Sequence, residues 1–170
     1  TTNTISKLAD PGNPNPYAMG NPAGVAVRPA NGNVYIAWEA PAPYRVSVFG
    51  WNGTNYTLAV PWPGLDIGYG QGVGVAYSPS SDRIFVNAYN DNRVVYIEAS
   101  TNVTAALALP AGSGPHIGIA ANLNTGRIYV ANRLNGTLTV IQDGMLATPT
   151  PTSTSTATPT PTATSTPTAT

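Results

Sequence analysis

Three segments of the chain repeat one pattern, and this repetition constrains the fold more than any other feature of the sequence. The copies lie at spacings of 50 and 44 residues: "GVAVRPANGNVYIAW" from Gly24, "GVAYSPSSDRIFVNA" from Gly74 and "GIAANLNTGRIYVAN" from Gly118. Each copy joins a strand of small and apolar residues to a second strand through a turn rich in Asn, Ser, Gly or Asp. Apolar runs on both sides of such a turn are typical of a β-hairpin.

Further strands follow each copy. A third strand begins at Arg45 ("RVSVF"), Arg93 ("RVVYI") and Thr137 ("TLTVI"), and Asn135-Gly136 predicts a tight turn before the last of these. A fourth strand follows the first two copies only, as "YTLAV" and "VTAALAL". The third copy lacks it, but the N-terminal stretch "TISKLADPG" resembles the missing piece.

Four-stranded antiparallel sheets that recur every 44 to 50 residues are typical of β-propeller blades. We therefore expect an all-β repeat domain over residues 1–146, with four-stranded antiparallel blades at about 13–64, 65–112 and 113–144. Residues 4–9 would complete the last blade, either in the same chain or in a neighbouring subunit. The residues expected to donate this strand are Ile5, Ser6, Lys7, Leu8 and Ala9.

The third copy, "GPHIGIAANLNTGRIYVANRLNGTLTVIQDG", resembles the YVTN-type repeats of bacterial and archaeal surface propellers, which are similar to NHL repeats. The resemblance rests on Pro115-His116, the Gly-Ile-Ala strand, "NTGRIYVAN", the Asn-Gly turn and "LTVI". The other copies depart from it, with "VYIAW" and "IFVNA" in place of "IYVAN". The resemblance covers roughly residues 4 to 144. It implies a propeller that serves as a scaffold or binds a partner, and it does not imply a specific activity.

Three blades are too few for a closed propeller, since propellers close with about 4 to 8 blades. A solitary wedge of three would expose an apolar face at each end. We expect self-association, as a ring of two chains or as a head-to-tail filament. Two alternatives are a small closed unit of three blades and a fragment of a larger propeller.

The C-terminal segment, residues 147–170, is of low complexity, and every even-numbered residue from Thr148 to Thr170 is Thr. Such a composition predicts an extended stalk or linker, and Thr or Ser with Pro is typical of O-glycosylated stalks. We expect the tail to be ordered by assembly or by sugar. The candidate O-glycosylation sites are Thr148, Thr150, Thr152, Thr160 and Thr162.

Four Asn-x-Thr triplets begin at or near expected turns, at Asn52, Asn55, Asn102 and Asn135. Exposed turns of secreted proteins are where N-glycosylation occurs, so these are candidate sites. The alternative is that Asn is present because tight turns favour it.

Only 8% of residues are charged, and the formal net charge is zero. No basic patch is available for nucleic acid, and no apolar run reaches the length needed for membrane insertion. Cysteine is absent, which excludes disulfides and thiolate chemistry. We expect an extracellular or cell-surface protein whose partners are its own copies and glycans.

His116 is the only histidine. It precedes the expected innermost strand of the last blade, where the related streptogramin-inactivating lyases use a histidine with bound magnesium. No spacing joins it to Asp10 or Asp66, and no nucleophile motif supports a triad with Ser78 and Asp82. "NAYNDN" lacks the spacing of a calcium loop, and no helix follows "GYGQGVG" to bind phosphate. We predict no catalytic, cofactor or metal site.

Aromatic residues gather in the first blade and its connections: Trp38, Trp51, Trp62, Tyr44 and Tyr56. They are expected to pack between blades, and the alternative is a sugar-binding surface. The sequence thus favours a non-enzymatic structural module that self-associates. A carbohydrate- or ligand-binding propeller on a stalk is the second interpretation, and a lyase-type enzyme is the third.

Overall fold

The computed structural model describes residues 21–39, 44–61, 64–68, 70–114 and 116–144. These residues form strands joined by turns, without a helix, and so none of them forms a helix that could cross a membrane. The strands are β1 (Pro22–Arg28), β2 (Asn33–Trp38), β3 (Arg45–Trp51), β4 (Tyr56–Leu58), β5 (Leu65–Asp66), β6 (Gly72–Ser78), β7 (Arg83–Ala88), β8 (Arg93–Glu98), β9 (Thr104–Ala108), β10 (His116–Asn122), β11 (Arg127–Asn132) and β12 (Thr137–Gln142).

The strands form three antiparallel sheets, which confirms the all-β antiparallel fold expected from the repeat. The first sheet has the order β1-β2-β3-β4, with β5 also paired to β3; the second is β6-β7-β8-β9; the third is β10-β11-β12. Each sheet starts with the strands of one repeat copy and adds the predicted third strand. The segment expected to complete the third sheet, residues 4–9, lies outside the described residues.

The first sheet contains a fifth strand that the repeat comparison did not predict. β4 is short and pairs only with the end of β3, from Phe49 to Trp51. The start of the same edge is therefore open, and Leu65 and Asp66 pair there with Val46 and Arg45. The chain thus returns to the first sheet at residues that the sequence comparison assigned to the beginning of the second blade.

The turn before β12 is also longer than the tight turn expected from Asn135-Gly136. β11 ends at Asn132, which pairs with Thr137, so four residues form the connection. Gly136 has a φ of 66° and Asn135 does not share this left-handed conformation. The Asn135 side chain instead accepts hydrogen bonds from the Thr137 backbone N–H (3.2 Å) and hydroxyl (2.6 Å).

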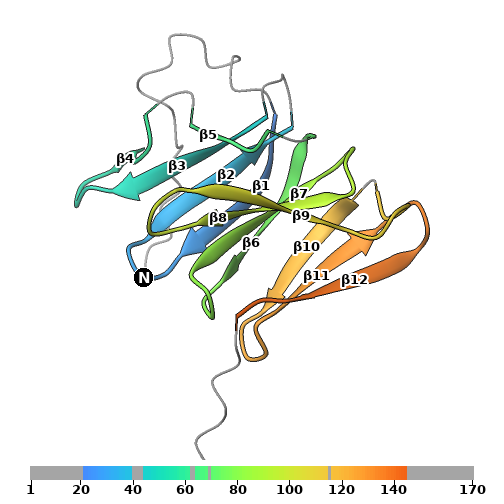
Figure 1. Cartoon of the computed structure of the whole chain (residues 1–170). Helices are drawn as coiled ribbons and strands as arrows, with labels where there is room; N and C mark the ends of the chain where they lie inside the picture. The colour runs from blue at the N-terminus through green and yellow to red at the C-terminus, as the bar shows by residue number, and fades with distance from the viewer. Residues whose placement is uncertain (1–20, 40–43, 62–63, 69, 115, 145–170) are drawn as a thin grey trace, which may run out of the picture.

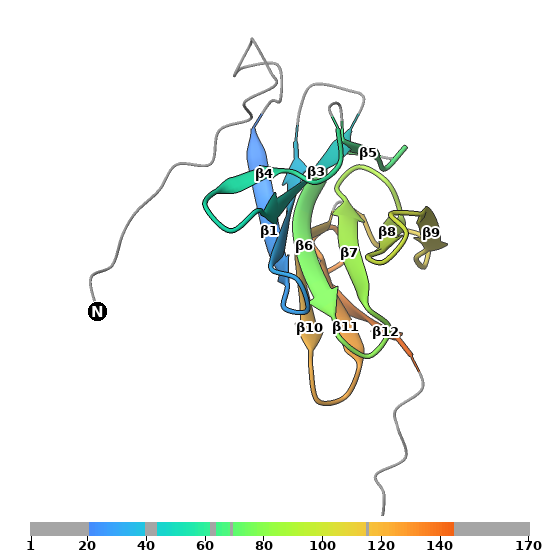
Figure 2. The same ribbon diagram turned by 90° about the vertical axis from the view of Figure 1, so that its left-hand side faces the viewer.

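The three sheets lie side by side, with the second between the other two (Figure 1). The first strand of the second sheet, β6, lies against both β1 and β10. The turns that follow β1, β6 and β10 all point to one end of the molecule (Figure 2). Meander sheets packed through their first strands are typical of neighbouring propeller blades.

Two apolar clusters hold the sheets together. The first lies between the first and second sheets and includes Tyr35, Val48, Ile84 and Val95. The second lies between the second and third sheets and includes Phe85, Val94, Ile128 and Val130. The second sheet is thus apolar on both faces, and five of the six residues of β7 are buried. In β12, by contrast, the burial pattern shows no fully buried residue.

Candidate functional site

Each sheet has two faces, and alignment of the three repeats shows which face of one sheet corresponds to which face of the next. We call forward the face that carries Tyr35 in the first sheet, Phe85 in the second and Tyr129 in the third. The other face is called backward. The forward face of the first sheet packs on the backward face of the second, and the forward face of the second packs on the backward face of the third.

On two faces no described sheet packs: the backward face of the first sheet and the forward face of the third. Part of the backward face of the first sheet is nevertheless covered, because Val34 and Phe49 are buried there in a cluster with Ile36, Trp38, Tyr56 and Leu58. On the backward face of the first sheet, Val25 and Val27 are 62% and 50% exposed. On the forward face of the third, Leu138 and Val140 are 57% and 51% exposed. Large aliphatic side chains grouped in this way on a sheet face typically mark an interaction surface. Exposed apolar side chains are therefore present on both end faces of the three-sheet stack.

β12 also has an open edge. It is the last strand of the third sheet, whereas in the second sheet β9 pairs beyond β8 at the equivalent place. Within the described residues no strand pairs with β12 on its outer side. Unpaired N–H and C=O groups at such an edge accept an additional strand readily.

An ion pair joins the first two sheets at the end where the turns gather. Arg28 donates from Nε and Nη2 to the two carboxylate oxygens of Asp82, at 2.7 and 2.5 Å, and the Tyr77 hydroxyl donates to Oδ1 at 3.2 Å. The hydrogen bond from Arg28 lowers the pKa of Asp82 and, in return, raises the pKa of Arg28. Burial raises the pKa of Tyr77. This bidentate contact fixes how the two sheets align.

Asp82 takes an unusual backbone conformation to make this contact. Its φ is 55°, in the left-handed region, and glycine occupies the equivalent turn position in the other two repeats, as Gly32 (φ 71°) and Gly126 (φ 61°). Asp is among the non-glycine residues that tolerate this region. A carboxylate is therefore present where the turn itself would favour glycine.

A second polar contact joins the second and third sheets at the same end. Arg83 pairs with Glu98 of its own sheet (2.7 Å) and with Asp143, which follows β12 (3.3 Å). The Asp143 side chain is only 2% exposed, and the Ser81 hydroxyl also donates to it. The Arg83 guanidinium lies 4.5 Å from the centroid of the Tyr96 ring. These contacts stabilise the interface between sheets and have the geometry of structural ion pairs.

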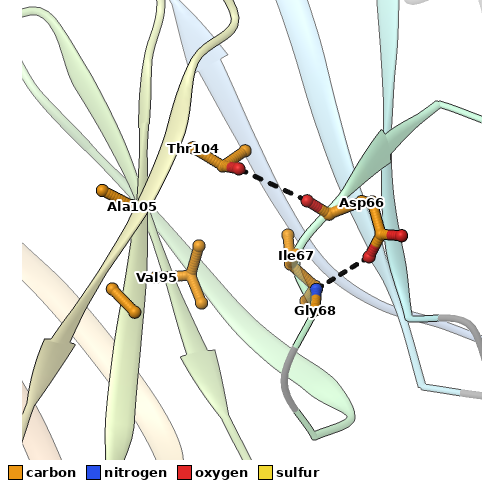
Figure 3. Close-up of a pocket in the computed structure, with 7 residues that line it drawn as sticks. Asp66, Ile67, Gly68, Val95, Thr104 and Ala105 are labelled. Atoms are coloured by element: carbon orange, nitrogen blue, oxygen red, sulfur yellow. Dashed lines mark hydrogen bonds between the residues drawn. The ribbon is translucent and has the colours of Figure 1, made fainter.

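A cavity of about 340 Å³ opens between β5 of the first sheet and β8 and β9 of the second (Figure 3). The Thr104 hydroxyl and the Asp66 backbone carbonyl lie 3.5 Å apart across it, and Asp66 Oδ1 accepts the Gly68 N–H at 2.8 Å. Asp66 also pairs with Arg45 at 3.7 Å. Asp66 is the only carboxylate among the residues that line this cavity, so the described lining does not bring together an acid and a base.

A second groove, of about 370 Å³, runs over the first strands of all three sheets. Its lining is apolar apart from the Tyr77 hydroxyl: Ala26, Val27, Pro29, Val75, Ala76, Tyr77, Ile119, Ala120, Ala121 and Leu123. The equivalent surface of a propeller borders its central channel. No group of three or more His, Cys, Asp or Glu that could bind a metal occurs in the described part of the chain.

All four candidate N-glycosylation sites lie on exposed turns. Asn52 and Asn55 occupy the turn between β3 and β4, Asn102 the turn between β8 and β9, and Asn135 the turn between β11 and β12. Asn52 Oδ1 accepts the backbone N–H groups of Thr54 and Asn55, at 3.0 and 2.9 Å. Asn102 has a φ of 61°. These asparagines thus stabilise their turns and are also exposed, so both interpretations of the Asn-x-Thr triplets remain open.

The structure describes only the backbone of His116 and none of the other predicted residues near the two ends of the sequence. The backbone of His116 pairs with Asn132 at the start of β10. The strand-donating residues Ile5 to Ala9, and Thr148, Thr150, Thr152, Thr160 and Thr162, lie outside the described residues. Sequence reasoning missed the contacts of Asp82 and Asp143. The one signal for Asp82 was an aspartate where the other two copies have glycine.

No protein family matches the sequence, and no curated protein matches it. Among solved structures, the chain is similar to a chain of a nidogen/laminin complex (13% identity, TM-score 0.48, 72% of this chain and 47% of that one). It is also similar to a gluconolactonase from Xanthomonas campestris (13%, 0.49, 67% and 35%) and to apo AztD from Citrobacter koseri (8%, 0.43, 72% and 34%). The chain thus spans less than half the length of these proteins, at an identity that assigns neither family nor activity.

Proposed function

We propose that this protein is a non-enzymatic structural module of the cell surface or extracellular space, which associates with its own copies into an oligomer or filament. The observation that carries the proposal is that large aliphatic side chains are exposed on both end faces of the three-sheet stack, on which no described sheet packs. Burial of apolar surface contributes roughly 25 cal/mol per Å², so exposed Val25, Val27, Leu138 and Val140 favour association.

Strand complementation is the proposed means of joining. Residues 4–9 of one chain would pair with the open edge of β12 and give the third sheet the fourth strand that the second sheet has in β9. Backbone hydrogen bonds would supply affinity, and the alternation of side chains would set the register. The three sheets described here would then be propeller blades of the YVTN type, and two chains would supply six blades for a ring.

The proposal also includes glycosylation. The sequon residues Asn52, Asn55, Asn102 and Asn135 are exposed, and the Thr-rich segment 147–170 has the composition of an O-glycosylated stalk. Attached sugar would keep a chain of zero formal net charge dispersed. Enzymatic or chemical removal of sugar should lower the mass of the protein purified from its native host. A mass that does not change on deglycosylation would contradict this part of the proposal.

Association is tested by light scattering on a dilution series of the purified chain. The mass should exceed that of one chain and decrease on dilution. Deleting residues 1–12 should abolish association if strand complementation joins the copies, while deleting residues 148–170 serves as the control. A chain that remains a monomer at every concentration would refute the proposed function. Normal association of the N-terminal deletion would refute the strand mechanism.

A second candidate function is carbohydrate binding, favoured by one exposed aromatic pair. Trp51 is 52% exposed and its ring centroid lies 5.2 Å from that of Tyr56. Aromatic faces of this kind bind the apolar faces of sugars. Saturable quenching or protection of Trp fluorescence by an oligosaccharide, lost in Trp51→Ala, would support this candidate. Unchanged fluorescence over a panel of oligosaccharides would exclude it.

A further inference from the structure

One packing contact occurs at both interfaces between sheets. In the first sheet, a Cβ added to Gly24 would lie 3.0 Å from Val75 Cγ2 of the second sheet. In the second sheet, a Cβ added to Gly74 would lie 2.9 Å from Ile119 Cγ2 of the third. At both places, glycine on a forward face provides the space into which a β-branched side chain of the next sheet packs. Real Cβ atoms essentially never approach another atom as closely as 2.9 Å, and at Gly24 the Val73 backbone oxygen would lie closer still, at 2.8 Å, so both positions favour glycine.

The third sheet carries the same glycine without its partner. Gly118 is equivalent to Gly24 and Gly74, and all three follow or lie within an irregularity in the pairing of the first two strands of their sheets. A Cβ added to Gly118 would meet only Ala131 Cβ of its own sheet, at 3.7 Å, which is an ordinary contact. Within its own sheet, the third glycine is therefore not required by packing.

The first sheet carries the corresponding β-branched residue, Val25, but no described sheet precedes it to supply a glycine on which Val25 could pack. Val25 is equivalent to Val75 and Ile119, the residues that pack on Gly24 and Gly74. Val25 is 62% exposed and lines a small apolar hollow of about 220 Å³ with Pro22, Ala23, Gly24 and Ile36. The two halves of one contact thus lie unused at opposite ends of the stack.

We propose that Gly118 of one copy of this chain receives Val25 of a second copy. The forward face of the third sheet then docks on the backward face of the first sheet of the neighbour, in the register of the two internal interfaces. Tyr129, Leu138 and Val140 would cover Val25, Val27 and Ile36. The inference rests on the proposed self-association and adds its partner surfaces and its register.

The occupant is a second copy because the two faces cannot meet within the described part of one chain. The second sheet lies between them, and they face outward on opposite sides (Figure 1). Neither set of three residues carries an ionisable group other than the Tyr129 hydroxyl, and the chain has zero formal net charge. Charge therefore does not oppose the contact. Because the contact joins two different surfaces, repeating it gives a ring if the rotation closes and a filament if it does not.

Gly118→Val separates association from folding. A Cβ at this position meets only Ala131 Cβ at 3.7 Å within the monomer, so the thermal unfolding midpoint measured below the association concentration should not fall. In the assembly the new side chain would occupy the place of Val25, and the dissociation constant should rise at least about 10-fold. Ala108→Val also introduces a valine, at an exposed position of β9 away from both end faces, and should leave association unchanged.

A cross-link tests the register directly, because the chain has no cysteine of its own. The internal contact places the two Cβ positions within about 4.5 Å, which suits a disulfide. Mild oxidation of the Gly118→Cys/Val25→Cys double variant should give a ladder of multimers for a filament or a single dimer band for a two-chain ring. Gly118→Cys alone and Ala108→Cys/Val25→Cys should give neither.

The outcomes distinguish this inference from the function on which it rests. A wild-type chain that stays monomeric at every concentration overturns both. A wild-type chain that associates, together with a Gly118→Val variant of unchanged dissociation constant, overturns the register alone. Equal cross-linking in the Ala108→Cys/Val25→Cys control overturns it as well.

Discussion

The second and third sheets contain strands of nearly the same sequence in different surroundings. β7 and β11 both begin with Arg-Ile and continue with an aromatic residue and Val. In β7 the aromatic residue, Phe85, is 1% exposed because the third sheet covers it, whereas its equivalent Tyr129 is only half-buried. Arg83 pairs with Glu98 and Asp143, whereas the equivalent Arg127 donates to Gln142 Oε1 at 3.2 Å.

A repeated sequence therefore determines that a strand forms but not how deeply it is buried. The neighbour on the forward side supplies the cover, and the third sheet has no such neighbour among the described residues. Equivalent substitutions in the second and third sheets test whether their burial differs in this way.

The largest effect is expected from truncating the aromatic residue. Phe85→Ala should lower the free energy of unfolding by about 3–5 kcal/mol, because it leaves a cavity between two sheets. Tyr129→Ala should cost much less in dilute protein, because its environment is already partly open. Urea denaturation measures both. Under the proposed self-association, the loss of stability caused by Tyr129→Ala should grow with protein concentration. An equal loss of stability from Phe85→Ala and Tyr129→Ala in dilute protein would contradict the difference in burial between the two sheets.

A smaller effect is expected at the glycines. Gly74→Ala should destabilise the chain by roughly 1–3 kcal/mol, because its Cβ would clash with Ile119. Gly118→Ala should be neutral or stabilising by up to about 1 kcal/mol, since glycine within a strand costs conformational entropy. Thermal unfolding midpoints in dilute solution compare the two. A loss at Gly118 as large as that at Gly74 would show that the third sheet is packed like the second.

The smallest effect is a pH dependence at the ion pair between the first and second sheets. The pKa of Asp82 is lowered in the folded protein, so its contribution to stability is present above the unfolded pKa, near 3.8, and is lost as the pH falls through the lower folded value. Asp82→Asn keeps a residue that tolerates positive φ but removes this titration. The stability difference between wild type and Asp82→Asn, from urea denaturation at pH 2 to 6, should therefore shrink below about pH 4. A difference that does not change with pH would mean that Arg28 does not stabilise the carboxylate.

Much of the fold followed from the sequence. Alternating apolar residues and the turn-forming residues between them predicted the hairpins of all three sheets, because side chains of a strand alternate between its faces. β5 was missed because two residues are too few to show alternation, and their pairing depends on how much of the edge of β3 is left open by β4. The turn at Asn135-Gly136 was predicted too short, since the pairing of Asn132 with Thr137 decides its length.

The existence of two end faces was predicted from the sequence, but the residues that make their contacts were not. Counting three repeats predicted an end face without a neighbouring sheet on either side of the stack, since each sheet needs a neighbour on both faces. The burial of Val34 and Phe49 on one of these end faces was not predicted. The sequence did not identify Gly118 and Val25 as a contact, because the close approach of glycine to a β-branched residue appears only where the sheets meet. The interface role of Asp143 is likewise invisible in sequence, because Ser81 and Arg83 reach it from another sheet.

Local alternation and turn residues were enough to predict all the described strands except β5, the order of those strands and the number of repeats. Which face of each sheet is covered, which glycines receive a neighbouring side chain and which ion pairs cross between sheets became apparent only from the packing of the sheets. Those outcomes depend on residues some 40 to 60 positions apart, such as Arg28 with Asp82 and Arg83 with Asp143, which the sheet packing alone brings together.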